Sequence, residues 1–356
     1  MNILIVNPYG IGDCLFATPL LHSLKDAFPG NKIGFLCNKR TGQLLRNNPF
    51  IDEIFIYERD EFKRLESVSW FAWFKEFASF IRRLRKAKFD LAIDLSLATP
   101  FGFFLFLAGI KKRLGYNYKN RGFYLTQSIN LIAYDAKHMV DYYNGLLGLL
   151  NLTPKYRDME LYLGKEDIAY AQNLLGENNI DSLSPVISIA PGGGASWGKE
   201  AYLKYWPADN YKILIHKILE KYNAAIIIVG DLADRNLLGE VDERVINLSG
   251  KITLAQTAAF IQKADLFIGN DGGLLHMAVA LGKKTLSFFG PVDPLVYGPY
   301  PQAPHRHIAV KKTLECSPCY RKFRLSPCQR NRECLESINV TEALKAVEEL
   351  LARKEQ

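Results

Sequence analysis

Features that would identify several common classes of protein are absent from this 356-residue sequence. No apolar stretch reaches the roughly 20 residues of a membrane helix. The longest candidate, residues 91–110, is interrupted by Asp94, Pro100 and two glycines. Met1-Asn2 leads directly into an apolar strand with no secretory leader, and no short repeat or low-complexity tract occurs. We therefore expect a globular protein that stays in the cytoplasm.

Two nucleotide-binding motifs are incomplete. The loop Asn7–Asp13 contains two glycines, but Leu15 stands where a dinucleotide-binding loop needs a third. Residues 193–199 match the glycines and lysine of a P-loop, yet Glu200 replaces the Ser or Thr that would hold magnesium. The basic residues form no recognised RNA- or DNA-binding motif. These gaps argue against an NAD enzyme, a P-loop NTPase and a nucleic-acid-binding protein.

The composition is that of a globular protein, with 48% hydrophobic and 23% charged residues. The length exceeds what one ordinary core needs and suits two domains. A net charge of +8 favours an anionic partner, and a nucleotide, a phosphorylated glycolipid, a nucleic acid or a membrane surface would each qualify.

Short buried strands alternate with amphipathic helices in both halves of the chain. Strands are expected at residues 3–6, 32–37, 52–56, 89–95, 186–190, 225–229, 265–268 and 284–289. Helices are expected at residues 13–28, 69–88, 139–150, 208–222, 253–263, 273–281 and 341–353. The alternation predicts an α/β protein of two doubly wound, Rossmann-like domains facing a cleft, residues 1–165 and 166–356. Ligands of such sheets bind beyond the carboxyl ends of strands, so the loops there are candidate sites.

The loop after the first strand ends at Asp13. This residue is equally consistent with a helix N-cap and with a carboxylate that takes a proton from a hydroxyl. In the second such loop, residues 191–199, glycine N–H groups and Ser196 are suited to gripping a diphosphate. Lys199 and Lys204 compete as the accompanying cation, and each is also consistent with a solvated surface charge.

The third loop, residues 269–276, is the most specific of the three. Asp271 is placed to meet ribose or base, and the bare N–H groups of Gly272 and Gly273 at a helix start can meet phosphate. His276 follows one turn later, where a core histidine is as common as a ligand contact. Asp231 also follows a strand and is equally consistent with a loop cap and with a ribose contact.

The order of these motifs resembles glycosyltransferase family 9, the bacterial ADP-heptose:lipopolysaccharide heptosyltransferases. The resemblance covers nearly the whole chain and rests on these segments: Asn2–Pro29, Phe89–Asp94, Arg113–Tyr116, Lys204–Pro207, Asp271–His276 and Phe289–Pro294. It implies a GT-B fold, an inverting mechanism with Asp13 as the base, and an ADP-heptose donor held mainly by the C-terminal domain. No cofactor is implied for catalysis.

The loops after the strands and the resemblance together give a set of candidate site residues. The catalytic pair is Asp13 and Lys204, because Lys204 lies in the family's Lys-x-Trp-Pro pattern. The donor-binding residues are Gly193, Gly194, Ser196, Lys199, Asp231, Asp271, Gly272, Gly273, Leu274 and His276. The acceptor-binding residues are Gly12, Arg113, Arg121 and His138. One departure is Gly272, which stands where the family commonly has Ser or Thr, so glycine N–H groups must contribute more there.

The implied acceptor is an anionic glycolipid, the lipid A-core. Two other interpretations stay open: a protein Ser or Thr acceptor for the same donor, and a catalytically silent binding module. Residues 70–84 form an aromatic stripe followed by a basic run, which is typical of core packing with a solvated face. The alternative is an interfacial helix that contacts the inner face of the inner membrane.

Four of the six cysteines lie in residues 316–334. Their spacing, Cys316-x2-Cys319-x8-Cys328-x5-Cys334, suits a structural tetrahedral zinc or iron site. Buried thiols or a disulfide pair are the alternatives.

Overall fold

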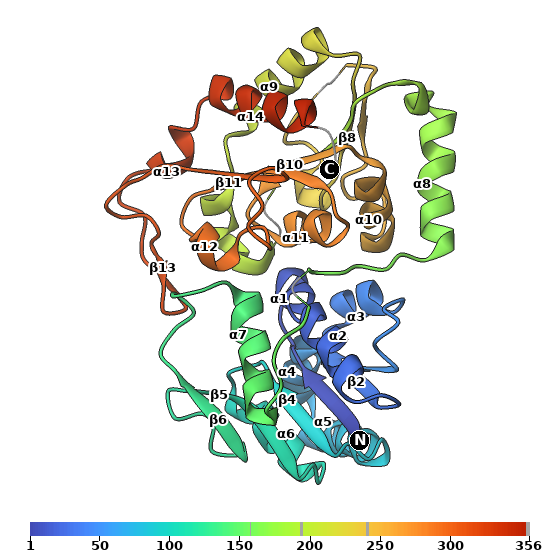
Figure 1. Ribbon diagram of the computed structural model, residues 1–356, viewed down its shortest axis with the longest axis vertical. Helices are drawn as coiled ribbons and strands as arrows, with labels where there is room; N and C mark the ends of the chain where they lie inside the picture. The colour runs from blue at the N-terminus through green and yellow to red at the C-terminus, as the bar shows by residue number, and fades with distance from the viewer. Residues whose placement is uncertain (157, 193–194, 240–241, 354–356) are drawn as a thin grey trace. The chain divides into compact units, whose positions relative to one another are not determined.

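The computed structural model describes residues 1–156, 158–192, 195–239 and 242–353, without the side chains of residues 181, 195 and 196. The chain divides into two compact units (Figure 1). Unit 1 comprises Met1–Tyr134 and Met139–Arg157, and unit 2 comprises Asp135–His138 and Asp158–Gln356. The boundary expected at 165/166 stays a prediction.

Unit 1 is built on a six-stranded parallel sheet of order β3-β2-β1-β4-β5-β6. Its strands are β1 (Asn2–Val6), β2 (Lys32–Cys37), β3 (Glu53–Ile56), β4 (Leu91–Asp94), β5 (Lys112–Tyr118) and β6 (Gln127–Leu131). The central strands β1 and β4 are almost entirely buried, as expected for a parallel sheet covered on both faces.

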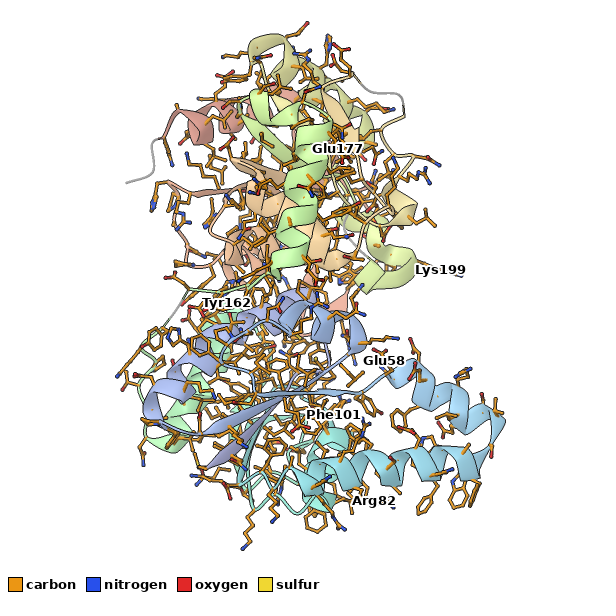
Figure 2. The ribbon with its side chains drawn as sticks, turned by 90° about the vertical axis from the view of Figure 1, so that its right-hand side faces the viewer. Glu58, Arg82, Phe101, Tyr162, Glu177 and Lys199 are labelled. Carbon is orange, nitrogen blue, oxygen red and sulfur yellow. The ribbon has the colours of Figure 1, made fainter. Side chains whose placement is uncertain are left out.

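The helices of unit 1 are α1 (Ile11–Phe16), α2 (Thr18–Ala27), α3 (Lys39–Leu45), α4 (Arg59–Val68), α5 (Trp70–Lys86), α6 (Thr99–Leu107) and α7 (Met139–Gly145), with the 3-10 helix η1 (Leu146–Leu150). One expected helix, 13–28, is broken at Ala17, because Pro19 in the first turn of α2 cannot donate a backbone hydrogen bond. Residues of α4, α5 and α6 pack on one face of the sheet. Figure 2 shows α4 and α5 as a hairpin that projects from the rest of unit 1.

Unit 2 repeats the same plan, with a six-stranded parallel sheet of order β12-β11-β10-β7-β8-β9. Its strands are β7 (Val186–Ala190), β8 (Ala225–Ile228), β9 (Val245–Asn247), β10 (Leu266–Asn270), β11 (Lys284–Phe289) and β12 (His307–Lys311). A two-stranded antiparallel ribbon, β13 (Tyr320–Arg321) and β14 (Arg324–Leu325), lies in the cysteine-rich segment.

The helices of unit 2 are α8 (Lys165–Glu177), α9 (Ala208–Lys221), α10 (Leu254–Lys263), α11 (Gly273–Ala280), α12 (Pro294–Tyr297), α13 (Glu333–Glu336) and α14 (Val340–Ala352). Its 3-10 helices are η2 (Ile180–Ser182), η3 (Ala195–Lys204) and η4 (Leu232–Asp234). Alternate strand residues such as Ile226 and Ile228 meet α9 and α14 in one core, while α10 and α11 pack on the opposite face.

Both sheets have the doubly wound order, in which strands are added first on one side of the unit's first strand and then, after a reversal of the order, on its other side. The reversal lies between β1 and β4 in unit 1 and between β7 and β10 in unit 2. Ligands of such folds bind beyond the carboxyl ends of these strands. The loops that carry Asp13 and Asp271 occupy these positions. None of the helices in the described parts of the chain is long and apolar enough to cross a membrane.

Candidate active site

Asp13 lies in the first turn of α1, directly beyond the carboxyl end of β1. Gly10 is the helix N-cap, and its N–H group donates to Oδ2 of Asp13 at 3.3 Å. The buried side-chain amide of Asn7 donates to the backbone carbonyl of Asp13 at 2.8 Å. Asp13 therefore stabilises the start of the helix while its half-buried carboxylate remains near the surface, so the two roles expected from the sequence are compatible.

The last residue of β4, which lies next to β1 in the sheet, is an acid that the sequence analysis did not select. Asp94 is paired with Val6 in the sheet register and is buried. Burial raises its pKa to about 6, although hydrogen bonds from Ser96 act in the opposite direction. The hydroxyl of Tyr9 donates to the carbonyl of Ser96 and so joins the loops that follow β1 and β4. The sequence did contain a signal for this residue, because an acid at the last position of an apolar strand lies at the edge of the sheet where ligands bind.

The acceptor residues expected in unit 1 lie apart from one another. Arg113 is near the amino end of β5, whereas Asp13 follows the carboxyl end of β1, so the structure does not bring them together. The Arg113 guanidinium donates to the carbonyl of Tyr124 at 2.5 Å and lies over the ring of Phe106. Arg121 is exposed over the ring of Tyr118 in the next loop, and Gly12 is in α1 beside Asp13.

His138 lies with unit 2 rather than with the N-terminal residues expected beside it. Its ring stacks on Tyr300 with centroids 4.5 Å apart, and Nε2 is 2.9 Å from the carbonyl oxygen of Gly298. A carbonyl only accepts, so Nε2 carries the proton in this contact. These two contacts explain the grouping, and they place His138 close enough to His276 to affect the pKa of that residue.

Lys204 and Asp271 form a buried ion pair in unit 2. Lys204 Nζ is 2.6 Å from Asp271 Oδ2, and the two side chains are 8% and 7% exposed. The ammonium also lies 4.5 Å from the centre of the Trp197 ring. A desolvated cation and carboxylate therefore meet directly beyond β10.

Asn270 holds this region together and was not selected from the sequence. Its side-chain amide donates to the carbonyls of Pro191 and Gly192, at 2.7 and 3.0 Å. Its side-chain carbonyl accepts from the N–H of Trp206 at 2.9 Å. One buried amide thus joins the loop after β7, the segment after Lys204 and the end of β10.

The helix α11 begins directly after Asp271. Gly272 is its N-cap, and Gly272, Gly273 and Leu274 are all partly exposed, so the first N–H groups of the helix are accessible. His276 is buried, and burial, reinforced by His138 and Lys204, lowers its pKa to about 3. It is therefore neutral at neutral pH and cannot serve as a phosphate-binding cation.

The other predicted donor residues are more dispersed. Gly193, Gly194 and the side chain of Ser196 lie outside the described residues. Lys199 is exposed, in contrast to Lys204. Asp231 is exposed and caps η4 by accepting from the N–H of Ala233 at 2.9 Å.

Asp234 is a second buried acid that sequence reasoning missed. Its carboxylate accepts from the N–H of Asp231 at 3.0 Å, and burial raises its pKa to about 6. A Cβ atom on Gly192 or Gly230 would lie 1.9 or 2.4 Å from its oxygens, so only glycine fits at either position. The carboxylate is therefore enclosed by the loops that follow β7 and β8.

The cysteine-rich segment contacts the chain around Lys204. The Arg332 guanidinium donates to the carbonyls of Tyr202 and Tyr205 at 3.0 and 3.2 Å. The ring of Tyr320 lies 5.3 Å from that of Trp197, which in turn covers Lys204. This segment therefore supports the position of the lysine.

The structure shows no ligand geometry among the described residues at the metal site predicted for this segment. Cys316, Cys319, Cys328 and Cys334 are free thiols. Across the part of the chain that the structure describes, no group of three or more His, Cys, Asp or Glu side chains is placed to hold a metal ion. The thiols are nevertheless neighbours: burial and then the other three cysteines raise the pKa of Cys334 to about 11. The four thiols are therefore close to one another, although the described residues show no ligand geometry around them.

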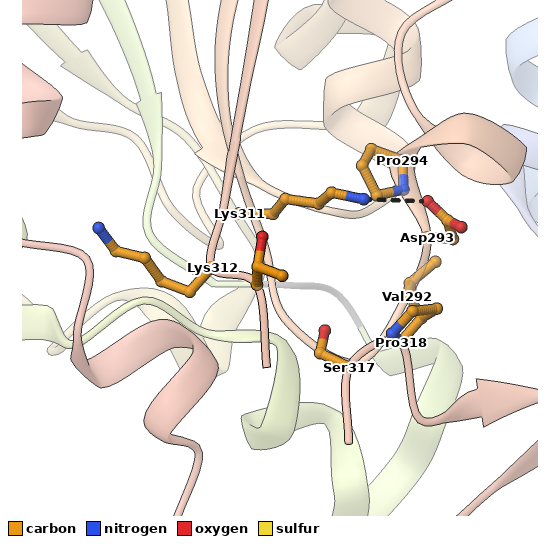
Figure 3. A pocket seen from close by; sticks show the side chains of 8 residues that line it. Val292, Asp293, Pro294, Lys311, Lys312, Ser317 and Pro318 are labelled. Carbon is orange, nitrogen blue, oxygen red and sulfur yellow. Dashed lines mark ion pairs between the residues drawn. The ribbon is translucent and has the colours of Figure 1, made fainter. Parts of the chain in front are cut away.

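A small cavity of about 50 Å³ lies beside the same segment (Figure 3). Its lining includes Asp293, Lys311, Lys312 and Ser317. Lys311 pairs with Asp293 at 3.6 Å, and Lys312 pairs with Glu342 at 2.5 Å. Ligand pockets usually enclose about 300–1,000 Å³, so this cavity is too small for a nucleotide sugar.

Comparisons with known proteins agree with this arrangement. The family model for glycosyltransferase family 9 (heptosyltransferase) matches residues 77–328. Lipooligosaccharide heptosyltransferase 2 of Haemophilus influenzae is 25% identical over 83% of this chain and 84% of its own length.

Two solved structures share the fold. A family 9 glycosyltransferase from Veillonella parvula has a TM-score of 0.81 and 20% identity, covering 99% of this chain and 97% of its own. ADP-heptose lps heptosyltransferase II of E. coli has a TM-score of 0.76 and 20% identity, covering 99% and 98%. With two Rossmann-like units and a family match over more than half of its length, the chain belongs to glycosyltransferase family 9 and is a glycosyltransferase of the GT-B fold.

Proposed function

We propose that this protein is an inverting heptosyltransferase that transfers heptose from ADP-heptose to a lipopolysaccharide inner-core acceptor at the cytoplasmic face of the inner membrane. The observation that carries the proposal is the buried Lys204–Asp271 pair directly before the glycine start of α11. A desolvated lysine and a helix N-terminus are both suited to a diphosphate. The names of the Haemophilus and E. coli relatives support the sugar and the acceptor class.

The reaction needs one base and one site for the departing diphosphate. The acceptor hydroxyl oxygen attacks the anomeric carbon from the face opposite the nucleotide, and Asp13 takes the hydroxyl proton. The bond from the anomeric carbon to the diphosphate oxygen breaks, and its electron pair leaves with ADP. Lys204 and the N–H groups of Gly272 and Gly273 stabilise the added negative charge, so the residues of this chain require no cofactor for the step.

The remaining donor contacts are assigned from position. Asp271 lies directly after the end of β10 and before the start of α11, so we assign its carboxylate to a hydroxyl of the ADP-heptose donor. We also assign Asp231 to the ribose. Its Oδ1 atom caps η4, but the carboxylate as a whole is exposed and can still accept a hydrogen bond from a ribose hydroxyl. The other residues that we assign to donor binding are Gly193, Gly194, Ser196, Lys199, Leu274 and His276.

The acceptor side is assigned to Gly12, Arg113, Arg121 and His138. Two of these side chains already form hydrogen bonds within the protein. Arg113 donates to the Tyr124 carbonyl, and Nε2 of His138 donates to the Gly298 carbonyl. Arg121 is the exposed cation of the group and is the residue we expect to contact an acceptor phosphate.

Nucleoside diphosphate release tests the proposal directly. Purified protein is incubated with ADP-heptose, UDP-glucose or GDP-mannose, each with delipidated core saccharide, with a Ser/Thr peptide or with no acceptor. We expect release only with ADP-heptose and core saccharide. Turnover with the peptide alone would establish a protein acceptor instead, and no turnover with any pair would leave only a silent binding module.

We further propose that the four clustered thiols bind a structural zinc or iron ion. Four soft ligands in one short segment fit either metal chemically, and Cys334 lies near the other three. Metal content of protein purified without a histidine tag decides the question. About one ion per chain is expected, and fewer than one per two chains would end the proposal. Loss of metal in a Cys319→Ser variant but not in a Cys37→Ser variant would locate the ion.

A further inference from the structure

The tip of the α4–α5 hairpin exposes large apolar side chains. Val68, Trp70, Phe71 and Phe74, which we call the hairpin tip, are between 50% and 79% exposed. Trp70 and Phe74 stack on each other, with ring centroids 5.9 Å apart. By contrast, Phe80, Ile81 and Leu84 in the second half of α5 are buried. The aromatic stripe that the sequence predicted as core is therefore buried only in the second half of α5 and is exposed in the first half.

The exposed half of α5 continues into a basic face. Phe71, Phe74, Ala78, Arg82 and Arg85 follow one another at intervals of three and four residues, so they lie on one side of the helix. Arg82 and Arg85 are exposed. Residues 59–88, which form the hairpin, contain nine basic and four acidic residues and thus carry a net charge of +5.

A second segment of unit 1 has the same character. Residues 111–124 comprise strand β5 and the turn that follows it; we call them the basic loop. They contain five basic residues and no acidic one, a net charge of +5. Phe123 is 84% exposed, and Tyr124 contacts both Phe123 and Phe106, which is 52% exposed. The basic loop thus also combines cations with exposed aromatic rings.

The two segments are neighbours in the fold. Arg85 of α5 donates through Nε to the carbonyl of Leu107 at 2.8 Å, at the end of α6. Leu107 adjoins Phe106, whose ring lies under the guanidinium of Arg113. The end of α5 opposite the hairpin tip therefore lies next to the basic loop, and the exposed face of α5 connects that end to the tip. Together the segments carry +10, against +8 for the whole chain, so the rest of the protein is net negative.

We propose that the hairpin tip and the basic loop form a surface that binds an anionic phospholipid bilayer. Exposed Trp and Phe side chains favour the boundary between headgroups and acyl chains, and lysines and arginines beside them are attracted to anionic headgroups. A nucleic acid would use the charge but not the protruding aliphatic and aromatic tip. The proposal concerns where the protein is held and does not depend on the identity of the donor.

Vesicle sedimentation tests the proposal with the full chain. Vesicles of phosphatidylethanolamine and phosphatidylglycerol are compared with vesicles of phosphatidylcholine alone, at 50 and 500 mM salt. We expect binding to the anionic vesicles at low salt and at least tenfold weaker partitioning to neutral vesicles or at high salt. Bromine-labelled acyl chains should quench the fluorescence of wild type and leave a Trp70→Phe variant much less quenched. Equal binding to both vesicle types, or no binding, would overturn the proposal.

Matched variants separate the surface from general stickiness. Trp70→Ser/Phe71→Ser/Phe74→Ser and Arg82→Glu/Lys86→Glu should each reduce partitioning at least tenfold. The controls are Ile213→Ser/Leu232→Ser and Lys212→Glu/Lys217→Glu, which change exposed residues of unit 2 and should bind as wild type does. If the tip variant instead changed the oligomeric state and left vesicle binding intact, the surface would be a protein interface and the proposal would be wrong.

The outcome is distinguishable from failure of the proposed reaction. ADP release with a soluble, delipidated acceptor needs no bilayer, so the tip variant should retain the wild-type rate in that assay. A protein that binds anionic vesicles but releases no ADP would refute the reaction alone, and one that releases ADP but ignores vesicles would refute the surface alone.

Discussion

The buried pair of Lys204 and Asp271 allows stability and donor binding to be tested separately. In a Lys204→Met variant, the Asp271 carboxylate stays buried without its cation. Removal of one partner from a buried pair costs about 3–5 kcal/mol, because the remaining charge is uncompensated. Both side chains are less than a tenth exposed, so solvent offers little relief.

The expected change in melting temperature follows from the size of the unit. Unit 2 is about 200 residues long, and for domains of that size 1 kcal/mol corresponds to roughly 2–4 °C. The Lys204→Met variant should therefore melt roughly 6–20 °C lower than wild type, by the same per-kilocalorie relation. Differential scanning calorimetry measures this shift.

A double variant provides the matched control. Lys204→Met/Asp271→Leu replaces the pair with apolar side chains of similar size, a change that is often neutral or stabilising. Its free energy of unfolding should return to within about 2 kcal/mol of wild type. Because both residues belong to the proposed donor site, acceptor-dependent ADP release should nevertheless fall at least a hundredfold in the single and the double variant alike.

Two results would refute this reasoning. A loss of less than about 1 kcal/mol in Lys204→Met would mean that the pair behaves as an exposed ion pair. Wild-type ADP release by the stable double variant would mean that neither side chain serves the donor.

Three further predictions concern residues around the same site. Asn270→Ala leaves two carbonyls and one N–H of the loops without their partner, and should lower the free energy of unfolding by about 1–3 kcal/mol and raise the KM for the donor, as calorimetry and kinetics would show. Asn236→Ala, at an exposed position of the same unit, is the control and should change neither quantity. Asp234 has a folded-state pKa of about 6 against 3.8 unfolded, so its destabilising charge develops as pH rises from about 4 to about 6. Asp234→Asn should therefore gain about 1–3 kcal/mol relative to wild type between pH 4 and pH 7 in urea titrations, and an unchanged difference would contradict the assignment. Arg332→Ala releases the carbonyls of Tyr202 and Tyr205 and should lower kcat/KM for the donor about tenfold by ADP release, whereas the exposed Arg330→Ala should change it little.

His276 acts in the direction opposite to Asp234. Its pKa is lowered to about 3, so its contribution to stability is present above its unfolded value of 6.5 and is lost as pH falls toward 3. The comparison of Asp234→Asn with wild type cancels this effect, because both proteins retain His276.

The sequence predicted the central strands well because they are continuous apolar runs. β1 and β8 read as buried strands on composition alone. β5 was not predicted, since Lys112, Arg113 and Asn117 give it no apolar run, and its place in the sheet depends on pairing with β4 and β6. Most of residues 13–28 are helical, as expected, but they form two helices and not one, because Pro19 interrupts the hydrogen bonding.

The candidate site was predictable only where residues lie in a recognisable local pattern. Asp271 and Lys204 belong to such patterns, and the structure brings them together. The role of Asn270 depends on carbonyls 78 and 79 residues away, which no local pattern indicates. The cysteine spacing predicted that the thiols are neighbours, and Cys334 does lie near the other three, but the described residues show no ligand geometry there.

The membrane-facing proposal also required the structure. A helical stripe of aromatic residues predicts one buried face, but not how far along the helix the sheet extends. Phe80 and Leu84 lie over the sheet of unit 1, while Trp70 and Phe71 lie beyond it and are exposed.

The most direct test of the proposed transfer is the rate of acceptor-dependent ADP release from ADP-heptose by wild type and by Asp13→Asn. The substitution preserves shape and hydrogen bonding to Gly10 while removing the base. Because general base catalysis contributes about 10²–10⁴-fold, we expect a loss of at least a hundredfold with an unchanged melting temperature. A wild-type rate in Asp13→Asn, or no acceptor-dependent release by the wild-type protein, would contradict the account.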